Sequence, residues 1–401
     1  MFLEALSRRN QALLRAATDL HRRGMIPANS YVLDLDAIEA NTATFCQSAH
    51  GLGLEVLAMA KQLGRPAPAL DAIVRGGADG FVAVDMTCAR AVHAAGHRLG
   101  HLGHLVQVPR GEADEAARAH PSVWTVFSMD KAREAAAAAG RAGRAQDLVA
   151  RIHAPGDVFY PGHEGGFPAD EIVGVAGAIG ATPNARFAGV TTFPALLFDP
   201  REQAVLPTPN LRTLERARLE LEAAGHERPV VNAPGTTSTD VLRTLADAGA
   251  TQVEPGHGLT GTTPLHAVRD LPEVPAMLYL SEVSHLYGSR AYVFGGGLYI
   301  DPVFEPYQVR ALVGGSADEI LARPPVAAQL PPPSAIDYYG QLDASERSIA
   351  TGDTVIFGFR AQAFVTRAFV VPLSGVSRGQ VAVEGVWTTD GRRAARGGEA
   401  P

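Results

Sequence analysis

The feature that most constrains the fold is a regular alternation of short apolar runs with alanine-rich helical stretches. Eight such runs follow one another along the chain: "VLAMAK", "GFVAVD", "HLVQVP", "VWTVFS", "LVARIH", "FAGVTTF", "PVVNAPG" and "TQVEPG". Strands that are apolar throughout and alternate with helices indicate a parallel sheet covered on both faces. Eight such units predict a (β/α)₈ barrel.

The pattern changes after residue 270. Short strands interrupted by Gly and Pro, at "AMLYLSEVSH", "AYVFGGG", "DTVIFGFRAQAF" and "TRAFVVPL", predict a mostly antiparallel β domain. The expected order is an N-terminal helix (1–29), the barrel (30–270), the β domain (271–390) and a tail (391–401). The first strand, in residues 30–36, is compatible with either the barrel or the β domain.

Charge and composition exclude several classes of partner. The net charge of −7 is spread without basic runs or interleaved aromatics, which argues against binding to nucleic acid or to a membrane surface. The chain shows no run of 18 apolar residues and no signal-peptide core, so we expect a cytoplasmic protein. Two cysteines, Cys46 and Cys88, form neither a disulfide framework nor a metal-ligand spacing, which fits a reducing compartment.

Two glycine- and threonine-rich segments follow the last two barrel strands, "APGTTSTD" and "EPGHGLTGTT". In (β/α)₈ barrels the active site lies at the carboxyl ends of the strands, and these two loops often bind a phosphate group through backbone N–H groups. Either segment alone is compatible with an ordinary turn. Together they predict a phosphate site.

Lys61, at the end of the first run, is one of only two lysines in a chain with 33 arginines. A lysine kept among arginines indicates a need for an amine that can lose its proton, and desolvation at a barrel mouth would lower its pKa. Lys131, at a helix start, shows that a lysine also persists without such a role. A strand-end lysine facing a phosphate cradle predicts a Schiff base with pyridoxal 5′-phosphate (PLP).

The segments "YVLDLDAIEANTATF", "AMAKQLGRP" and "EPGHGL", with the C-terminal β domain, resemble the fold-type III PLP enzymes over about residues 31–373. That group includes alanine racemase, D-threonine aldolase and the barrel-type amino-acid decarboxylases, and in detail the chain resembles its YhfX-type branch of racemase-like proteins. The resemblance implies that Lys61 carries the cofactor and that its phosphate is bound by Gly235, Thr236, Thr237 and the backbone of Gly256 and His257. It also implies a homodimer in which the β domain of one subunit completes the active site of the other.

Departures from this pattern narrow the chemistry. Glu254 stands where alanine racemase has an arginine that faces the pyridine nitrogen, and a carboxylate there keeps the ring protonated and a stronger electron sink. The decarboxylases share a carboxylate, but no cysteine follows Cys88 to supply their partner loop. No histidine follows His285, which disfavours a metal-dependent aldolase or dehydratase.

A PLP-dependent amino-acid racemase or epimerase is therefore the favoured reading, with proton donors and acceptors on both faces of Cα. Lys61 serves one face, and His285 or Tyr287, in "SEVSHLYGSR", is the candidate for the other. We expect His153 and Thr192 near the cofactor ring, Thr192 standing where several relatives have a histidine; a structural role is the alternative for His153 and His285. Weaker candidates for binding a substrate carboxylate or a phosphate are Arg290, Arg360 and Tyr339.

Three alternatives stay open: a PLP-dependent lyase or aldolase acting on a D- or hydroxy-amino acid, a non-catalytic PLP-binding protein, and a phosphate-binding barrel that does not bind PLP. The expected substrate is a small molecule, an amino acid. The spacing of His93, His97, His101 and His104 suggests a metal-binding helix, but glycines interrupt it and a strand begins near His101. We predict no metal site.

Overall fold

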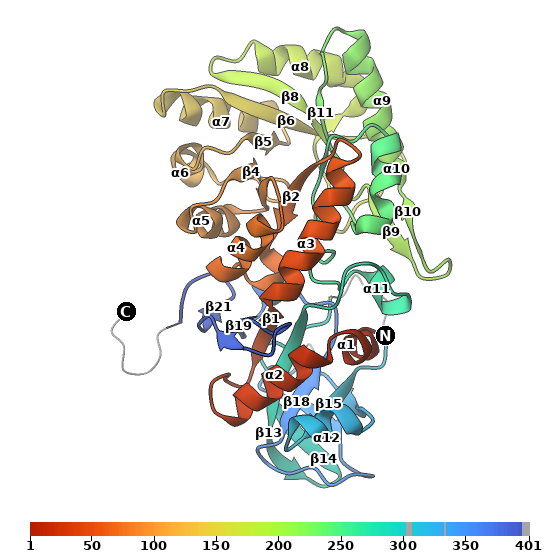
Figure 1. Ribbon diagram of the computed structural model, residues 1–401. Coiled ribbons are helices and arrows are strands. Elements are labelled where there is room, and N and C mark those ends of the chain that lie inside the picture. The colour runs from red at the N-terminus through yellow and green to blue at the C-terminus, as the bar shows by residue number, and fades with distance from the viewer. Residues whose placement is uncertain (302–306, 333, 395–401) are drawn as a thin grey trace. The chain divides into compact units, whose positions relative to one another are not determined.

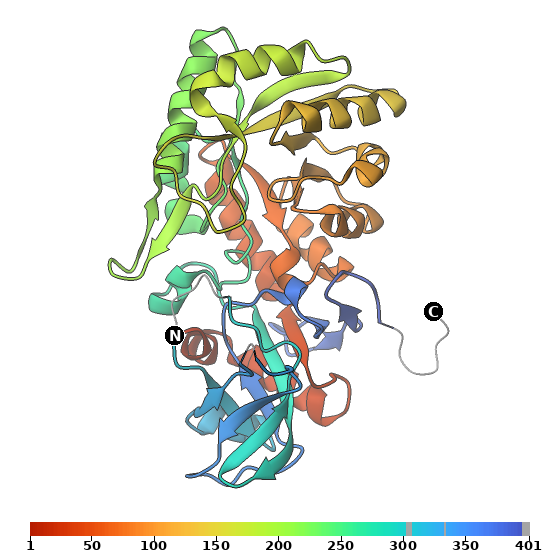
Figure 2. The same cartoon turned by 180° about the vertical axis from the view of Figure 1, so that it is seen from behind.

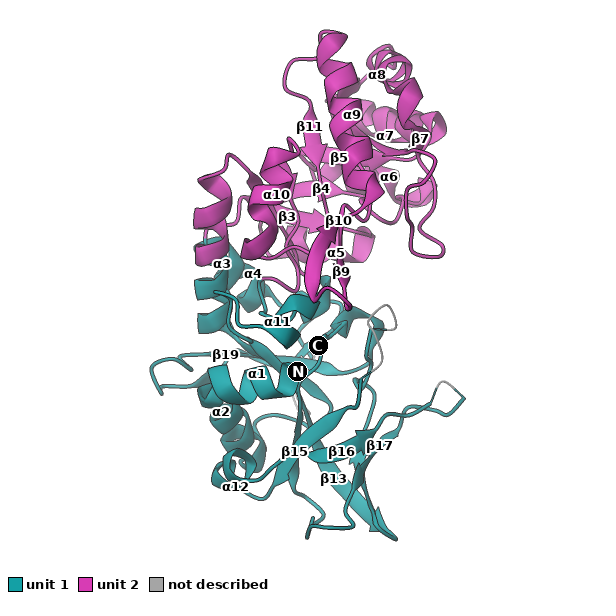
Figure 3. Ribbon diagram, turned by 90° about the vertical axis from the view of Figure 1, so that its right-hand side faces the viewer, with its two compact units in different colours: residues 1–42, 61–76, 259–401 teal, residues 43–60, 77–258 magenta. Residues whose placement is uncertain are grey.

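The computed structural model describes residues 1–301, 307–332 and 334–394. The chain divides into two compact units: the first contains residues 1–42, 61–76 and 259–401, and the second contains residues 43–60 and 77–258. Figure 3 shows them in different colours. Most of the predicted tail, 391–401, lies outside the described residues.

The second unit contains a closed ring of eight parallel strands, which confirms the predicted barrel. Neighbours pair in the order β2–β3–β4–β5–β6–β8–β11–β12, and β12 pairs back with β2. The strands are β2 (Glu55–Met59), β3 (Gly80–Ala83), β4 (Leu99–Leu102), β5 (Val123–Val126), β6 (Gln146–His153), β8 (Ala185–Thr191), β11 (Val230–Asn232) and β12 (Gln252–Val253). A short β7 (Phe167–Pro168) extends β6, and a hairpin of β9 (Leu196–Asp199) and β10 (Ala204–Pro207) follows β8.

The helix before β2 and the helices that follow the barrel strands in sequence can be traced in Figure 1. They are α3 (Leu35–His50), α4 (Ala67–Arg75), α5 (Met86–Ala94), α6 (Ala113–Arg118), α7 (Met129–Arg141), α8 (Ile172–Gly180), α9 (Pro209–Ala223) and α10 (Leu242–Asp247). Side-chain caps set the start of two of them: Asp85 accepts from the backbone of Cys88, and Ser128 from that of Lys131. The Lys131 ammonium binds the carbonyl of Val108 and Glu134, which gives the second lysine a structural role.

The predicted third strand, "HLVQVP", was wrong by about five residues. The structure places β4 at Leu99–Leu102, and the "HLVQVP" segment follows the strand as a loop. Gly100 accounts for the unexpected position, because a Cβ there would collide with Leu57 on β2. Gly103, with a φ of 76°, then turns the chain out of the strand. The consequence is that His101 lies within the barrel wall.

The first unit is built on a mostly antiparallel sheet, again as predicted. Its strand order is β14–β17–β16–β15–β18–β13–β1–β19–β20, with β21 also paired to β19 and β14 to β13. The strands are β1 (Ser30–Asp34), β13 (Met277–Tyr287), β14 (Arg290–Phe294), β15 (Arg310–Gly314), β16 (Val326–Gln329), β17 (Tyr339–Asp343), β18 (Thr354–Phe357), β19 (Phe369–Ser374), β20 (Ala382–Val383) and β21 (Trp387–Thr388). The long β13 is conspicuous in Figure 2.

The N-terminal segment forms two helices, α1 (Phe2–Arg9) and α2 (Gln11–Arg22), where one was expected. Their apolar side chains join β1, β13 and β18 and α12 (Ala317–Ala322) in one core, which includes Leu13, Leu14 and Leu280. The first strand, β1, lies between β13 and β19, so it belongs to this sheet and the barrel begins at β2. A short α11 (Pro264–Val268) follows the last barrel strand.

The proline-rich segment "ARPPVAAQL" contains β16, which pairs with β15 and β17. Among the helices of the described segments, none is both long and apolar enough to cross a membrane.

Candidate active site

Polar side chains line part of the barrel interior. Residues paired across parallel strands point to the same face of a sheet, and Arg151 on β6, Thr191 on β8 and Asn232 on β11 are successive register partners. Thr191 bonds Asn232, and Asn232 bonds Glu254, so this shared face is the interior. The buried set is His101, Thr125, Arg151, Thr191, Asn232 and Glu254. Barrel interiors are usually filled by branched apolar residues, so this polar set indicates a site.

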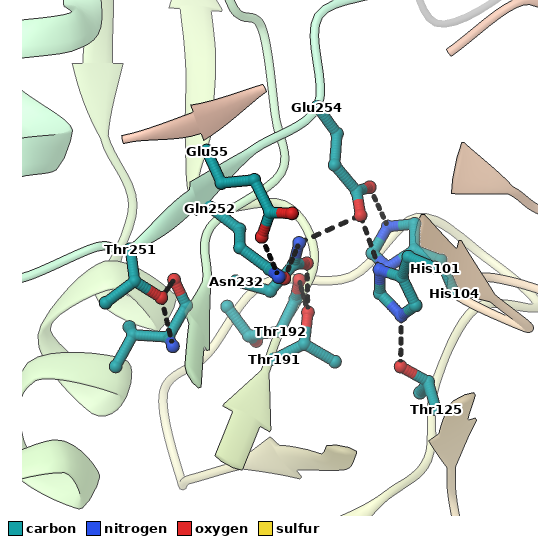
Figure 4. A network of polar contacts seen from close by, with 11 residues as sticks. Glu55, His101, His104, Thr125, Thr191, Thr192, Asn232, Thr251, Gln252 and Glu254 are labelled. Carbon is teal, nitrogen blue, oxygen red and sulfur yellow. Dashed lines mark hydrogen bonds and ion pairs between the residues drawn. The ribbon is translucent and has the colours of Figure 1, made fainter. Parts of the chain in front are cut away.

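Glu254 is the centre of a hydrogen-bond network, shown in Figure 4. Its Oε1 lies 2.5 Å from His101 Nδ1 and accepts from Asn232 Nδ2 at 2.9 Å. Within the described part of the chain, Oε2 is buried without a hydrogen-bond partner, and His104 Nε2 lies 3.7 Å from it. Burial would raise the pKa of Glu254, but the charges of His104 and His101 and the bonds from His101 and Asn232 outweigh it, and the pKa lies below its ordinary value. The carboxylate is therefore ionised at neutral pH.

The histidine row singled out in the sequence does not form a metal-binding helix. His93 lies exposed on α5 and His97 packs against Phe81, whereas His101 and His104 reach Glu254. The ligand atoms of His101, His104 and Glu254 lie within 4.8 Å of one another. His101, however, hydrogen-bonds through both ring nitrogens, each at 2.5 Å. In this arrangement the His101 ring is engaged in a hydrogen-bond network with Glu254 and Thr125.

Arg151 was not predicted, and it is the largest fully buried side chain in the described residues. One guanidinium nitrogen, Nη2, donates to the carbonyl of His163 at 2.7 Å, and the group packs over the Phe127 ring at 4.8 Å. In the residues that the structure describes, Nε and Nη1 are buried with no hydrogen-bond partner. Burial lowers the pKa of Arg151 to about 10. A buried cation with two open N–H groups and no carboxylate is suited to an anionic ligand.

The two predicted phosphate loops pack tightly against each other. A Cβ on Gly258 would lie 2.5 Å from the carbonyl oxygen of Thr237. Gly235 is equally crowded, but by the backbone of Leu196 in the β9 hairpin, which also accepts from the backbone N–H of Thr236. These glycines therefore permit close contacts between loops.

A hydroxyl that the sequence reasoning passed over lies in the same segment. Ser238 Oγ is buried without a hydrogen-bond partner among the described residues, directly before the helical turn η4 (Thr239–Val241). Thr237 is also buried, and its hydroxyl bonds the carbonyl of Gly235. Gly256 and His257 are buried in the turn after β12. An open hydroxyl beside these loops suits a phosphate oxygen.

Lys61 follows the end of β2 by two residues and begins the helical turn η1 (Lys61–Leu63). Its ammonium lies 4.9 Å from the centroid of the Phe364 ring, on the turn η5 (Ala363–Val365) of the same unit. A cation over an aromatic face is a favourable contact. The lysine is therefore held at the strand end at which it was predicted.

Thr192 and His153 were both expected near the cofactor ring. They differ in the contacts that their side chains make with the protein. Thr192 Oγ1 donates to the carbonyl of Ile152 and accepts from Asn210, so its hydroxyl has two protein partners. His153 ends β6, half-buried, with its ring edge-on to Phe159.

His285 and Tyr287, the candidates for the second proton-transfer group, are exposed on β13. The His285 ring stacks on Tyr292 at 4.6 Å and meets Tyr339 edge-on, and Tyr287 is 76% exposed. His285 thus contacts Ser284, Tyr292 and Tyr339, all of them residues of the β domain.

The weaker candidates have protein partners. Arg290 donates to Gln329 and Gln341, and Arg360 pairs with the buried Asp301. Tyr339 lies in the aromatic cluster with His285.

Comparison with known proteins identifies the family. Residues 33–264 match the family described as alanine racemase, N-terminal domain, and residues 278–383 match the YhfX-like C-terminal domain. Protein YhfX of Escherichia coli strain K12 is 39% identical over 385 residues, covering 96% of this chain and 97% of that protein. The chain belongs to the alanine racemase-like, fold-type III family of PLP enzymes. Its C-terminal domain is of the YhfX-like type.

Solved structures with the same fold include both isomerases and lyases. D-threonine aldolase from Filomicrobium marinum has a TM-score of 0.69 at 20% identity, covering 92% of this chain and 96% of its own. Alanine racemase from Corynebacterium glutamicum has a TM-score of 0.60 at 18% identity, covering 84% of this chain and 91% of its own. At these identities the likeness concerns the fold.

The barrel residues fit the cofactor that this family uses, PLP. A protonated pyridine nitrogen needs an acceptor, and Glu254 Oε2 is an open, ionised one. The phenolic oxygen of PLP, or the carboxylate of an amino acid, needs a donor such as the open N–H groups of Arg151. Ser238 and the two packed loops suit the phosphate.

Proposed function

We propose that the chain is a PLP-dependent amino-acid racemase or epimerase that moves a proton at Cα. The observation that carries the proposal is the ionised, buried Glu254 with one carboxylate oxygen left open. When bound, PLP supplies an electron sink for negative charge at Cα, and a carboxylate facing the ring nitrogen strengthens that sink. Such a site favours removal of the α-proton.

Each of these residues then has a distinct task. Lys61 would hold the cofactor through its aldehyde group, and its amine would accept or donate the α-proton on one face. Glu254 accepts the N–H of the ring. Arg151, with two open N–H groups, binds an oxyanion and so orients the substrate or the ring. The phosphate is bound by Thr236, Thr237 and Ser238 and by the backbone of Gly256 and His257.

The proton on the opposite face is assigned to a second copy of the chain. His285 and Tyr287 are the only candidates that we predicted for this task, and both are exposed on β13. An exposed histidine and tyrosine on a rigid strand can complete a neighbouring subunit's site. We therefore propose a homodimer with shared active sites.

A PLP-dependent lyase is the second candidate, and the similarity to D-threonine aldolase favours it. Our preference for a racemase rests on the β domain. No histidine follows His285 in the sequence to supply the ligand that a metal-dependent aldolase or dehydratase would need there.

The first test asks whether Lys61 bonds the cofactor. Protein purified with PLP should show a visible absorbance band that borohydride treatment removes. Lys61→Arg should abolish the band, because a guanidinium does not bond an aldehyde at neutral pH. Lys131→Arg is the matched control and should keep it, since the Lys131 ammonium binds Val108 and Glu134. A wild type that stays colourless after soaking in PLP would contradict the proposal.

The second test separates the chemistries by NMR of L- and D-amino acids in D₂O with the PLP-loaded protein. Loss of the α-proton signal together with formation of the other enantiomer is the expected result. Release of an aldehyde or a keto acid would identify a lyase instead. A stable absorbance band with no exchange for any amino acid would indicate a non-catalytic PLP-binding protein.

A further inference from the structure

His101 lies between two buried partners inside the barrel, and no role was predicted for it. Its Nδ1 is 2.5 Å from Glu254 Oε1, and its Nε2 is 2.5 Å from Thr125 Oγ1. All three side chains are buried. Figure 4 shows the row Glu254, His101, Thr125. Glu254 directly follows β12, His101 lies on β4 and Thr125 lies on β5. A histidine held at both nitrogens has a single orientation.

The direction of each hydrogen bond follows from the groups involved. An ionised carboxylate only accepts, so the proton in the bond to Glu254 sits on His101 Nδ1. On the other side of the carboxylate, Thr191 Oγ1 donates to Asn232 Oδ1 at 2.8 Å, which turns the Asn232 amide N–H toward Glu254. Both donors meet the same oxygen, Oε1. The network thus fixes the rotamer of the Glu254 carboxylate. It leaves Oε2 as the oxygen that can accept a hydrogen bond from a ligand.

This arrangement also decides the charge of the carboxylate. A fully buried carboxylate without partners would take up a proton rather than stay charged. The groups facing Glu254 are His101, His104 and Asn232, and their combined effect keeps its pKa below the ordinary value. His104 Nε2, at 3.7 Å from Oε2, is beyond hydrogen-bond distance. His101 is therefore the one imidazole in direct hydrogen-bond contact with the carboxylate among the described residues.

We propose that His101, oriented by Thr125, is a positioning residue that keeps Glu254 ionised and directs its Oε2 at the N–H of the cofactor's pyridine ring. The inference rests on the proposed function, which assigns Glu254 to that nitrogen. His101 itself does not touch the cofactor or the substrate. It acts by holding the proton on the ring, and so it sets the acidity of the substrate α-proton.

The test measures the ring nitrogen directly. Wild type is loaded with PLP labelled with ¹⁵N in the pyridine ring, and the ¹⁵N NMR shift across neutral pH reports whether that nitrogen carries a proton. We expect a protonated nitrogen in wild type and an unprotonated one in Glu254→Gln. His101→Phe, which removes the donor but keeps an aromatic ring, should behave like Glu254→Gln and weaken PLP binding about tenfold.

Two further variants keep the inference falsifiable if His101→Phe folds poorly. His101→Gln retains an N–H donor and should keep the nitrogen more protonated than His101→Phe. Thr125→Val removes only the hydroxyl behind His101 and should shift the loss of the proton to lower pH than in wild type. His93→Phe, on the exposed face of α5, is the matched control and should leave the ¹⁵N signal unchanged.

The outcomes separate this inference from the proposed function. A wild type that takes up no PLP overturns both. A wild type that binds PLP with an unprotonated nitrogen overturns the inference, as does a His101→Phe variant whose nitrogen stays as protonated as in wild type. The inference is also overturned if stoichiometric divalent metal copurifies with wild type and is lost in His101→Phe, because His101, His104 and Glu254 would then be metal ligands.

Discussion

Two histidine-centred clusters of this protein differ in how much they reveal about a ligand. In the barrel, His101 is buried and bonded at both nitrogens, and its neighbours Glu254 and Arg151 keep open polar atoms. On β13, His285 is exposed, and it is held chiefly by stacking on Tyr292 and by the edge of Tyr339.

The difference lies in the cost of leaving polar atoms without partners. Burial makes an open carboxylate oxygen or guanidinium N–H expensive, so these atoms indicate the charges and the hydrogen bonds of a missing ligand. An exposed ring bonds water at no such cost. The barrel cluster therefore indicates the chemistry of its ligand within one chain. The β13 cluster would indicate a function only together with a second molecule bound to it.

The largest effect is expected from the exposed cluster, if it supplies the second proton-transfer group. Replacing His285 and Tyr287 together by Gln and Phe should lower kcat about 10²–10⁴-fold, the usual contribution of a general acid or base. Mixing this double variant with Lys61→Arg, after dissociation and reassociation, should restore part of the activity through mixed dimers. Unchanged activity in the double variant would show that the β13 cluster has no catalytic role.

Glu254→Gln should lower kcat about 10²–10³-fold, as expected for loss of one preorganised electrostatic partner. The cofactor band at Lys61 should persist, because the covalent bond does not involve Glu254. If kcat of Glu254→Gln were unchanged, the Glu254 carboxylate would have no role in the mechanism.

The same variant should alter stability toward acid. The folded-state pKa of Glu254 lies below its unfolded value, so its ionised form stabilises the fold above the unfolded pKa, and this contribution is lost as pH falls through the folded pKa. Urea unfolding of Glu254→Gln should therefore depend less on pH in the acid range than unfolding of wild type. His93→Gln, on the exposed face of α5, is the control and should follow wild type. Parallel curves for Glu254→Gln and wild type would argue against an ionised Glu254.

Arg151→Met should stabilise the cofactor-free protein by about 1–3 kcal/mol, because it removes a buried charge with no carboxylate partner. The same change should weaken amino-acid binding to the loaded enzyme. Urea unfolding and absorbance titration measure the two effects. Arg133→Met, at an exposed ion pair with Asp130, should change stability by less than about 1 kcal/mol. A destabilised Arg151→Met variant would mean that the guanidinium is structural.

Tyr292→Leu tests the smallest effect, the stacking under His285. Loss of a stacked aromatic pair costs about 0.5–1.5 kcal/mol. Urea unfolding should show a change in that range, with the cofactor band intact. A change of the cofactor spectrum would instead link the two clusters within one chain.

The sequence predicted the barrel well because seven of its strands are apolar runs that no helix pattern competes with. It failed at β4, since "LGHL" contains a glycine and a histidine, whereas the following "HLVQVP" has the stronger strand composition. The strand forms at "LGHL" because a residue without a Cβ is needed at position 100 to leave room for Leu57. Packing between strands is not visible in a single run of residues.

The sequence pointed to only some residues of the candidate site, because several of them depend on contacts between distant segments. Glu254 was found through a motif, and its charge partner His101 was missed because the glycines around it broke the expected helix. Arg151 left a usable signal, a lone cation in the middle of the apolar run "LVARIH", that was not followed. Thr192 contacts strand β6, and Gly235 contacts the hairpin of β9. These contacts join segments that are distant in the sequence, so the local sequence does not predict them.

The contact of Gly258 with the Thr237 carbonyl has a consequence for engineering. Because a Cβ at Gly258 would lie 2.5 Å from that oxygen, the loops after β11 and β12 behave as a single block. Transplanting either loop alone from a relative should misplace both, whereas exchanging residues 233–240 together with 254–258 should preserve their fit. Directed changes of specificity would do best to keep this block constant and vary the surrounding loops.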